Sequence, residues 1–347
     1  MTKRFCTMPH WWAVGVSLLF ILCLAGDNAL GQEKLSPGTG IDTRSIPYKI
    51  VYESLREADG KKNWELIVIN ADGSNPVNLT KTANVSEIYP HASPDGTKIC
   101  FEGEEGEGKE KVRSVYCMNI DGTNRVKVAH NARQACWSPD GQTIAFLKAE
   151  FDRYTIQDFA TKGVYFYDLK TGKTTEHSNC AKLYHLYNLC WSPDGKWFAA
   201  TVHGGMGFDH ADLAFPADAN EVFDLTPFRV TGCRPDFSLD GKTITWGATD
   251  WDLCVGSIDC SSGKPQVTGV RTVVKCDKEH EVYHTDFSPD GRYIAFSYGP
   301  EANEMGGGEA PGWNICISDL SGKWVQITTD GNHNKEPDWV PTSATKP

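Results

Sequence analysis

The chain has 347 residues, of which 40% are hydrophobic and 23% charged, and its formal net charge at pH 7 is −11. This apolar content is enough to form a hydrophobic core, which excludes a wholly disordered chain. The acidic excess, without a basic stripe, argues against a protein that binds nucleic acid or an anionic membrane surface.

The N-terminus has the pattern of a secretory signal. Two basic residues precede an uncharged apolar run over 11–26, and 29–31 is a small-x-small cleavage site. The alternative is an uncleaved membrane anchor, although the run is short for a spanning helix. We expect a signal peptide over 1–31, a short linker over 32–46, and a mature protein that is periplasmic or secreted, without a membrane span.

The cysteines fit an exported protein. Ten of the twelve lie after the expected signal, and an even number in an oxidising compartment predicts some disulfides. Cys100 and Cys117 occupy consecutive predicted strands and would meet across a hairpin, whereas Cys136 and Cys190 hold equivalent places in different repeats, too far apart to bond. Alternatively, Cys100, Cys136 and Cys190 are small buried core residues. Neither a C-x-x-C nor an H-E-x-x-H motif occurs, so a zinc ribbon, covalent haem and a zincin site are unsupported.

A four-residue turn motif recurs along the chain. Proline suits the first corner of a tight turn, aspartate bonds backbone amides, and glycine accepts a positive φ. An aromatic residue usually precedes the motif. The copies are Ser93-Pro94-Asp95-Gly96, 138–141, 192–195, the variant Ser238-Leu239-Asp240-Gly241, 288–291 and a truncated copy at 337–341.

Strand-like segments follow each turn, rich in β-branched and aromatic residues and bounded by turn residues. The predicted second strands are 97–101, 143–146, 197–200, 243–246 and 293–296. The predicted third strands are 114–120, 163–169, 251–258 and 314–320, and short fourth strands include 125–129 and 324–328. Four strands in each repeat of about 40–50 residues are typical of a propeller blade.

The two ends of the repeat region complement each other. The N-terminal part supplies three strands between 48 and 80, and the C-terminal part supplies a lone first strand at 334–340. Pairing 334–340 with 48–52 closes a ring and removes an exposed sheet edge. The sequence therefore predicts an all-β protein, a six-bladed β-propeller of four-stranded antiparallel blades over 47–341, followed by a tail at 342–347.

The aromatic-Ser-Pro-Asp-Gly turn, the Ile-Ala-Phe strand and the Asn-Ala-Asp-Gly-Ser-Asn turn at 70–75 resemble the repeat of the TolB-like (WD-repeat-like) β-propeller family. The resemblance covers roughly 47–341 and implies the fold. The N-terminal α/β domain of TolB has no counterpart, so its role in envelope assembly is not implied. The G-x-S-x-G motif of the related prolyl oligopeptidases is absent, so the resemblance does not imply a serine peptidase.

Insertions gather on one face of the predicted ring. The Ser-Pro-Asp-Gly turns lie on one side, here named the turn face, and the longer loops lie on the opposite side, here named the insertion face. Long loops on a rigid scaffold commonly carry binding sites. The insertions are Glu102–Lys111, which holds an acidic run expected to be solvated, Lys148–Lys162, His203–Asp212 and Tyr298–Gly312.

The first strand of each blade lines the central channel, and two sets of polar residues recur on it. Alternation of side chains places both sets on one face of their strands. The first set, expected near the mouth as a ligand-binding ring, is Tyr89, Gln134, Asn188, Arg234, His284 and Glu336. The second set, expected deeper, is His91, Cys136, Cys190, Asp236, Asp286 and Asp338. Polar groups that converge on one axis favour a binding funnel.

The deeper set contains candidate metal ligands. His91, Asp236, Asp286 and Asp338 offer donors for a hard divalent cation such as calcium. The alternative is that each aspartate bonds backbone amides within its own blade.

Histidine and arginine residues supply catalytic candidates. These are His284, Arg234, His203 and His210, with His333 nearby in the predicted ring. The combination of histidine and arginine resembles that of oligogalacturonate lyase, a propeller enzyme in which a base removes the proton α to a carboxylate while a cation stabilises the developing charge. Ile88-Tyr89-Pro90-His91 and His333-Asn334 are loosely similar to its His-bearing strands. The alternative is that each histidine is solvated or structural.

These patterns favour an exported, monomeric binding or scaffold protein without catalytic activity, whose protein or glycan partner docks on the insertion face around the channel. The alternative is a carbohydrate-active enzyme that resembles oligogalacturonate lyase and acts on acidic polysaccharide.

Overall fold

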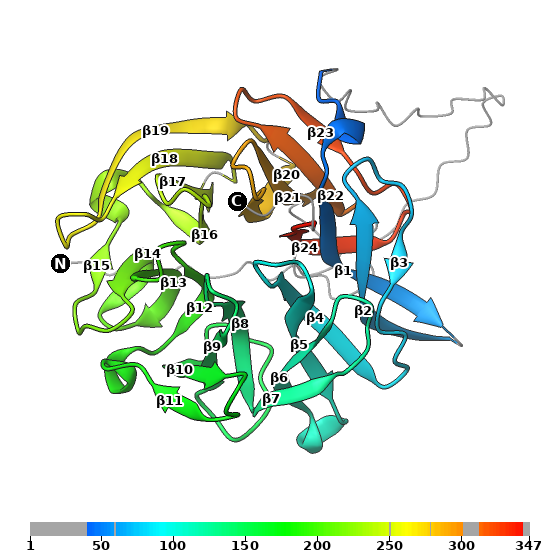
Figure 1. The fold of residues 1–347 in the computed structure, drawn as a ribbon, viewed down its shortest axis with the longest axis horizontal. Helices are drawn as coiled ribbons and strands as arrows, with labels where there is room; N and C mark the ends of the chain where they lie inside the picture. Colours follow the sequence, from blue (N-terminus) through cyan, green and yellow to red (C-terminus); the bar gives the residue numbers. More distant parts are fainter. Residues whose placement is uncertain (1–39, 59, 250, 278, 301–311, 343–347) are drawn as a thin grey trace, which may run out of the picture. The chain divides into compact units, whose positions relative to one another are not determined.

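The structure is a computed structural model that describes residues 40–342 except 59, 250, 278 and 301–311 (Figure 1). The expected signal peptide, most of the expected linker, and the Gly-rich part of the last insertion lie outside the described residues. Within the part of the chain that the structure describes, no helix is both long and apolar enough to cross a membrane.

Six four-stranded antiparallel sheets form the six predicted blades. From the innermost strand outward, blade 1 is β24 (His333–Val340), β1 (Lys49–Ala58), β2 (Lys61–Asn70) and β3 (Val77–Asn78). Blade 2 is β4 (Val85–Ala92), β5 (Lys98–Glu105), β6 (Val112–Asn119) and β7 (Val126–His130). Blade 3 is β8 (Ala132–Trp137), β9 (Thr143–Ala149), β10 (Thr161–Asp168) and β11 (Thr174–Glu176).

The remaining blades repeat this order. Blade 4 is β12 (Leu186–Trp191), β13 (Trp197–Gly205), β14 (Phe208–Pro216) and β15 (Phe223–Asp224). Blade 5 is β16 (Gly232–Phe237), β17 (Thr243–Ala248), β18 (Leu253–Asp259) and β19 (Gln266–Val274). Blade 6 is β20 (His280–Phe287), β21 (Tyr293–Pro300), β22 (Asn314–Asp319) and β23 (Trp324–Gln326). The helices of the described part are four 3-10 turns at Thr43–Ser45, Gly108–Glu110, Cys180–Lys182 and Thr226–Phe228.

Blade 1 joins the two ends of the propeller. β24 pairs antiparallel with β1, with Val340 opposite Lys49 and Trp339 opposite Ile50, so the last strand in the chain lies beside the first (Figure 1). The predicted closure of the ring is confirmed. Each of the two terminal strands therefore has a hydrogen-bonded neighbour, and neither presents an unpaired edge at the junction.

The repeated turn joins first to second strands. In the first copy, Gly96 has a φ of +67° and its N–H donates to the Ser93 carbonyl at 2.8 Å. The Asp95 carboxylate accepts hydrogen bonds from the Ser93 hydroxyl at 2.7 Å and from the Thr97 N–H at 3.0 Å. The same side-chain and backbone bonds recur in the other four complete copies. The turn chemistry expected from the sequence is therefore confirmed.

The core lies between neighbouring blades. The second strands present large buried side chains on the same face, because the strand alternates between its two faces. Those less than 2% exposed are Tyr52, Phe101, Phe146, Phe198, Trp246 and Phe296. In most interblade clusters they pack with residues of an adjacent blade, as where Phe296 and Leu253 join blades 6 and 5.

The ten cysteines of the described region are free thiols, so the predicted disulfides are not present. Cys100 does lie directly opposite Cys117 between β5 and β6, as predicted, but both side chains belong to the apolar cluster between blades 2 and 3. They are small core residues in this structure.

The stretch from His203 to His210, expected to be a loop, is a strand hairpin. β13 and β14 continue through it and place His203 directly opposite His210, with a tight turn at Met206 and Gly207. The glycines serve this turn, because Gly207 adopts a φ of +90°.

Candidate functional site

The first set of channel residues shares an unusual backbone conformation. All six have φ between +51° and +61°, although none is glycine. Each stands at a bulge, as in blade 2, where Ile88 pairs with Glu102 and His91 with Cys100, so that Tyr89 and Pro90 face a single partner residue. The bulge interrupts strict alternation. Three consecutive residues of an inner strand therefore reach the channel, rather than the two at alternate positions that the sequence predicts.

Hydrogen bonds from the preceding blade hold most of these strained residues. The donor is the backbone N–H of the residue with positive φ, and the acceptor is usually a side chain on the second strand of the blade before it. The pairs are Tyr89 to Glu53 (2.9 Å), Gln134 to Glu102 (2.9 Å), Asn188 to Gln134 (2.7 Å), Arg234 to Thr201 (2.8 Å) and Glu336 to Ser297 (3.1 Å). Such bonds offset the cost of the positive φ.

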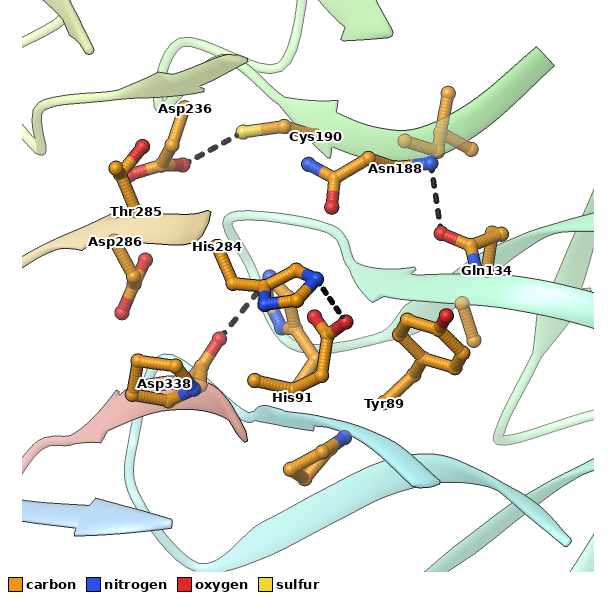
Figure 2. A pocket seen from close by; sticks show the side chains of 15 residues that line it. Tyr89, His91, Gln134, Asn188, Cys190, Asp236, His284, Thr285, Asp286 and Asp338 are labelled. Carbon is orange, nitrogen blue, oxygen red and sulfur yellow. Dashed lines mark hydrogen bonds and ion pairs between the residues drawn. The ribbon is translucent and has the colours of Figure 1, made fainter. Parts of the chain in front are cut away.

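A small cavity of about 70 Å³ lies on the channel axis (Figure 2). Five of the six first-set residues line it, all except Arg234, and from the second set Cys136 is missing. A space of this size holds a few water molecules, whereas pockets for drug-sized ligands are about 300–1,000 Å³. The predicted convergence on the axis is present, but the channel interior is too narrow for a sugar or peptide.

The three aspartates of the deeper set bond backbone amides. Asp236 accepts from the Phe287 N–H at 2.9 Å, Asp286 from Trp339 at 2.7 Å, and Asp338 from Ala92 at 3.0 Å. Each bond reaches the next blade around the ring. The alternative expectation, bonds within the same blade, is wrong about the partner, because these carboxylates join neighbouring blades.

The same aspartates are the metal candidates. Burial raises the pKa of Asp338 to about 6, and burial together with the neighbouring Asp338 and Asp236 raises that of Asp286. His91 Nε2 lies 3.8 Å from Asp338 Oδ2, and Cys190 Sγ donates to Asp236 at 2.8 Å (Figure 2). No group of three or more His, Cys, Asp and Glu side chains in the described ranges is arranged to hold a metal ion. The calcium site remains a prediction.

Arg234, His284 and Glu336 form a buried cluster above the cavity. Arg234 Nη1 lies 3.3 Å from Glu336 Oε1, and His284 Nε2 contacts the same oxygen. Burial raises the pKa of Glu336 and lowers that of His284, and the positive charge of Arg234 lowers the latter further. Both shifts disfavour the charged forms of the two side chains.

Aromatic rings surround the Arg234 guanidinium. Its carbon lies 5.7 Å from the ring centre of Tyr89, 5.5 Å from that of Tyr187 and 5.4 Å from that of Tyr283. These rings come from three different blades, and cation–π contacts stabilise a buried cation.

Asp158 completes the channel mouth. It lies in the insertion between β9 and β10, where its Oδ1 accepts a hydrogen bond from Arg113 Nη1 at 2.7 Å. Its Oδ2 accepts from the Tyr89 hydroxyl and lies 3.7 Å from Arg234 Nη2. Sequence reasoning placed the insertion on this face but identified neither Asp158 nor Arg113, because no repeat position or motif marks them.

The acidic run that begins at Glu102 is the expected solvated loop only at Gly106 and Glu107, which are exposed. β5 continues to Glu105, so Glu102 is fully buried, and burial raises its pKa to about 7. Glu104 accepts a hydrogen bond from Arg113 Nε at 2.9 Å. The run instead supplies buried acidic partners for the arginines at the mouth.

The catalytic candidates fall into separate groups. Arg234 and His284 are buried at the channel, whereas His203 and His210 are exposed, with ring centres 5.5 Å apart. The Tyr187 hydroxyl bonds His210 Nε2 at 3.1 Å, and its ring contacts Arg234, so Tyr187 lies between the two groups.

His333 belongs to neither group. It is buried and stacks on Trp313, with ring centres 6.0 Å apart and planes 7° apart. This packing is a structural role.

Comparison with known sequences finds partial relatives. No family profile matches the chain. It is 27% identical over 224 residues to the uncharacterized peptidase YuxL of Bacillus subtilis. The aligned region covers 62% of this chain and 30% of that protein. It is 24% identical to dipeptidyl-peptidase 5 of Porphyromonas gingivalis, over 88% of this chain and 48% of that protein. The chain therefore spans half or less of the length of these curated relatives.

Solved structures show the same fold. TolB from Acinetobacter baumannii superposes with a TM-score of 0.60 at 19% identity, over 85% of this chain and 67% of that one. A putative TolB from Agrobacterium tumefaciens gives 0.53 at 17% identity, over 85% and 99%. Hydrazine synthase of Kuenenia stuttgartiensis gives 0.56 at 12% identity, over 84% and 46%. Likeness at these identities shows the fold alone: the chain has a six-bladed β-propeller fold that is similar to those of the two TolB structures.

Proposed function

We propose that this chain is an exported binding module whose partner, a peptide or a protein, docks on the insertion face around the channel mouth. The observation that carries the proposal is the charged network at that mouth. Arg113, Asp158, Arg234 and Glu336 meet there from three blades and an insertion. Clustered charged and aromatic groups on a rigid scaffold favour recognition of a polar partner.

The insertion that carries Asp158 also exposes apolar side chains. Ile156 is 65% exposed and Phe151 is 39% exposed, on a loop that otherwise bonds to the propeller. Large apolar side chains on a functional loop are typical contact points for a partner. They lie on the insertion face because the loop joins the second and third strands of blade 3.

The relatives favour a peptide or protein partner over a glycan. Both curated relatives are named as peptidases. The channel cavity of about 70 Å³ does not admit a peptide chain, so the contact we propose is at the mouth. Export is part of the proposal, and it rests on the signal pattern over residues 1–31.

A paired surface experiment tests this function. Phe151→Ser combined with Ile156→Ser alters the insertion face, and Leu239→Ser alters an exposed apolar residue on the turn face. Each purified protein is applied to peptide and glycan arrays and to an envelope extract with crosslinking. We expect the double variant to lose peptide or protein binding and the Leu239 variant to keep it. Equal binding by all three proteins would contradict docking on the insertion face.

The exposed pair His203 and His210, joined to Arg234 through Tyr187, favours the lyase as a second candidate. Such an enzyme releases unsaturated products that absorb in the ultraviolet when it acts on uronate oligomers. A His210→Ala variant should lose that signal, whereas Asp209→Ala, an exposed neighbour, should keep it. No product across a panel of uronates would remove this candidate.

A further inference from the structure

The donors that surround Asp158 come from the propeller, whereas Asp158 comes from a loop. Tyr89 and Arg113 stand on β4 and β6 of blade 2, and Arg234 stands on β16 of blade 5. The side chains of both arginines are less than 9% exposed, and other bonds fix them in place. We refer to Tyr89, Arg113 and Arg234 as the carboxylate cradle, because the group they surround in this structure is a carboxylate.

Asp158 does not accept a hydrogen bond from every donor of the carboxylate cradle. Arg234 Nη2 lies 3.7 Å from the carboxylate, which is beyond hydrogen-bond distance, and the buried Arg234 Nε has no hydrogen-bond partner. A buried guanidinium nitrogen without an acceptor costs free energy. Arg234 therefore retains capacity for an acceptor that reaches further into the cradle than the short aspartate side chain does.

Burial disfavours the charged form of three other acids near Asp158. Burial raises the pKa of Glu53 and of Glu102 to about 7 and raises that of Glu336. By contrast, although burial acts to raise it, Arg113 and Arg234 hold the pKa of Asp158 below its usual range. Arg113 has a second ionised partner in Glu104, whose pKa it lowers and whose Oε2 lies 2.9 Å from Arg113 Nε, so Asp158 is the ionised carboxylate between the two arginines.

The bonds from Arg133 to this loop hold its backbone and not the Asp158 side chain. Arg133 donates to the Gln157 carbonyl at 2.5 Å and to the Thr155 carbonyl at 2.8 Å, and both bonds fix the backbone and leave the Asp158 side chain out. That side chain is 22% exposed. Rotation of this one side chain would take the carboxylate out of the cradle without breaking the two bonds from Arg133.

We propose that the carboxylate cradle is a ligand site for a peptide carboxylate, which Asp158 occupies as a built-in competitor in the free protein. This inference rests on the proposed function, since it names the chemistry that the mouth recognises. A free C-terminus and an acidic side chain offer the same group, and bidentate arginine contacts suit it. The competitor lowers the apparent affinity by the fraction of time that it occupies the site.

Formate tests the cradle itself. In Asp158→Ala, sodium formate should raise the melting temperature saturably above the effect of sodium chloride at equal ionic strength, and the wild type should show no such difference. Asp158→Asn, which keeps the size of the side chain, serves if the alanine variant does not fold. Asp152→Ala changes an exposed aspartate of the same loop and should behave as wild type. A formate effect no larger than that of chloride in both Asp158 variants would overturn the proposal.

Short peptides test the ligand class. Fluorescent trialanine with a free C-terminus, its C-terminal amide, and an amidated peptide with one internal aspartate are titrated against wild type and Asp158→Ala. We expect the variant to bind at least one carboxylate peptide about tenfold more tightly than wild type does and to ignore the amide. Equal affinity for the amide would overturn the proposal. A formate effect together with unchanged binding by the Phe151 and Ile156 variant would keep the cradle and reject the docking surface.

Discussion

Trp339 lies directly opposite Ile50, across 289 positions of sequence, and its indole N–H donates to the Asp286 carbonyl at 3.2 Å. One side chain thus contacts β1 in its own blade and β20 in blade 6. Its ring also packs edge-on against Tyr48, with centres 6.1 Å apart. Trp339 therefore contributes contacts on both sides of the junction that closes the ring.

Replacing Trp339 should open this closure. Trp339→Ala removes a ring that is 3% exposed, and truncation of such a buried aromatic costs about 3–5 kcal/mol. Urea unfolding followed by circular dichroism measures the loss. Trp324→Ala, at a half-buried ring on the outer strand of blade 6, is the matched control and should cost clearly less. Equal losses would show that the ring does not depend on the terminal strand.

The variant turn offers a stabilising change. Ser238-Leu239-Asp240-Gly241 makes the same bonds as the four turns that contain proline, and Leu239 is 54% exposed. Leu239→Pro should raise the free energy of unfolding by about 0.4–1 kcal/mol, because proline restricts the unfolded chain and suits this corner. Leu239→Ala separates this effect from the loss of the leucine side chain. A loss of stability in the proline variant alone would show that this turn differs from the others.

A thiol-labelling reagent should react with each of the ten free cysteines of the described region once the protein is unfolded. Cys260 and Cys276 are partly exposed and the other eight are buried, and burial raises the pKa of Cys117 to about 11 and those of Cys260 and Cys276 to about 12. Protonated, buried thiols react slowly. Native protein should label first at Cys260 and Cys276, and protein unfolded without reductant should label at all ten cysteines of the described region, which peptide mapping counts separately from Cys6 and Cys23. Eight labels or fewer after unfolding would reveal a disulfide.

The fold was predictable because its signals are local and repeated. The turn motif fixes where each second strand begins, so the blades and the pairing of 334–340 with 48–52 follow from counting turns. The bulge at Tyr89 and its five equivalents was not predictable, because tertiary bonds to acceptors such as Glu53 hold a non-glycine residue at positive φ.

The candidate site was predictable only in its repeated part. Arg234, His284 and Glu336 stand at equivalent positions and do meet. Asp158 and Arg113 lie outside the inner strands, and their contact depends on how an insertion folds back over the mouth. The outcome for the cysteines had a similar cause, since pairing across a hairpin does not decide whether two buried thiols bond.

A buried carboxyl beneath the mouth should make stability depend on pH. Asp212 is fully buried, accepts a hydrogen bond from the Thr201 hydroxyl at 2.8 Å, and has an Oδ2 without a hydrogen-bond partner. Burial raises its pKa from 3.8 to about 7. Because the folded state then binds the proton more tightly than the unfolded state, this group's contribution is fully present below about pH 4 and is lost as the pH rises to about 7.

Asp212→Asn should remove that dependence, since an amide does not ionise. The difference in the free energy of unfolding between pH 5 and pH 8 should shrink by on the order of 2–4 kcal/mol relative to wild type. Asp209→Asn, an exposed residue on the same strand, should leave the difference unchanged. Guanidinium unfolding at the two pH values measures it. If the Asp212→Asn variant and the wild type lost stability equally over this pH range, the pH dependence of stability would come from other buried acids. Glu102 is the next of these to replace.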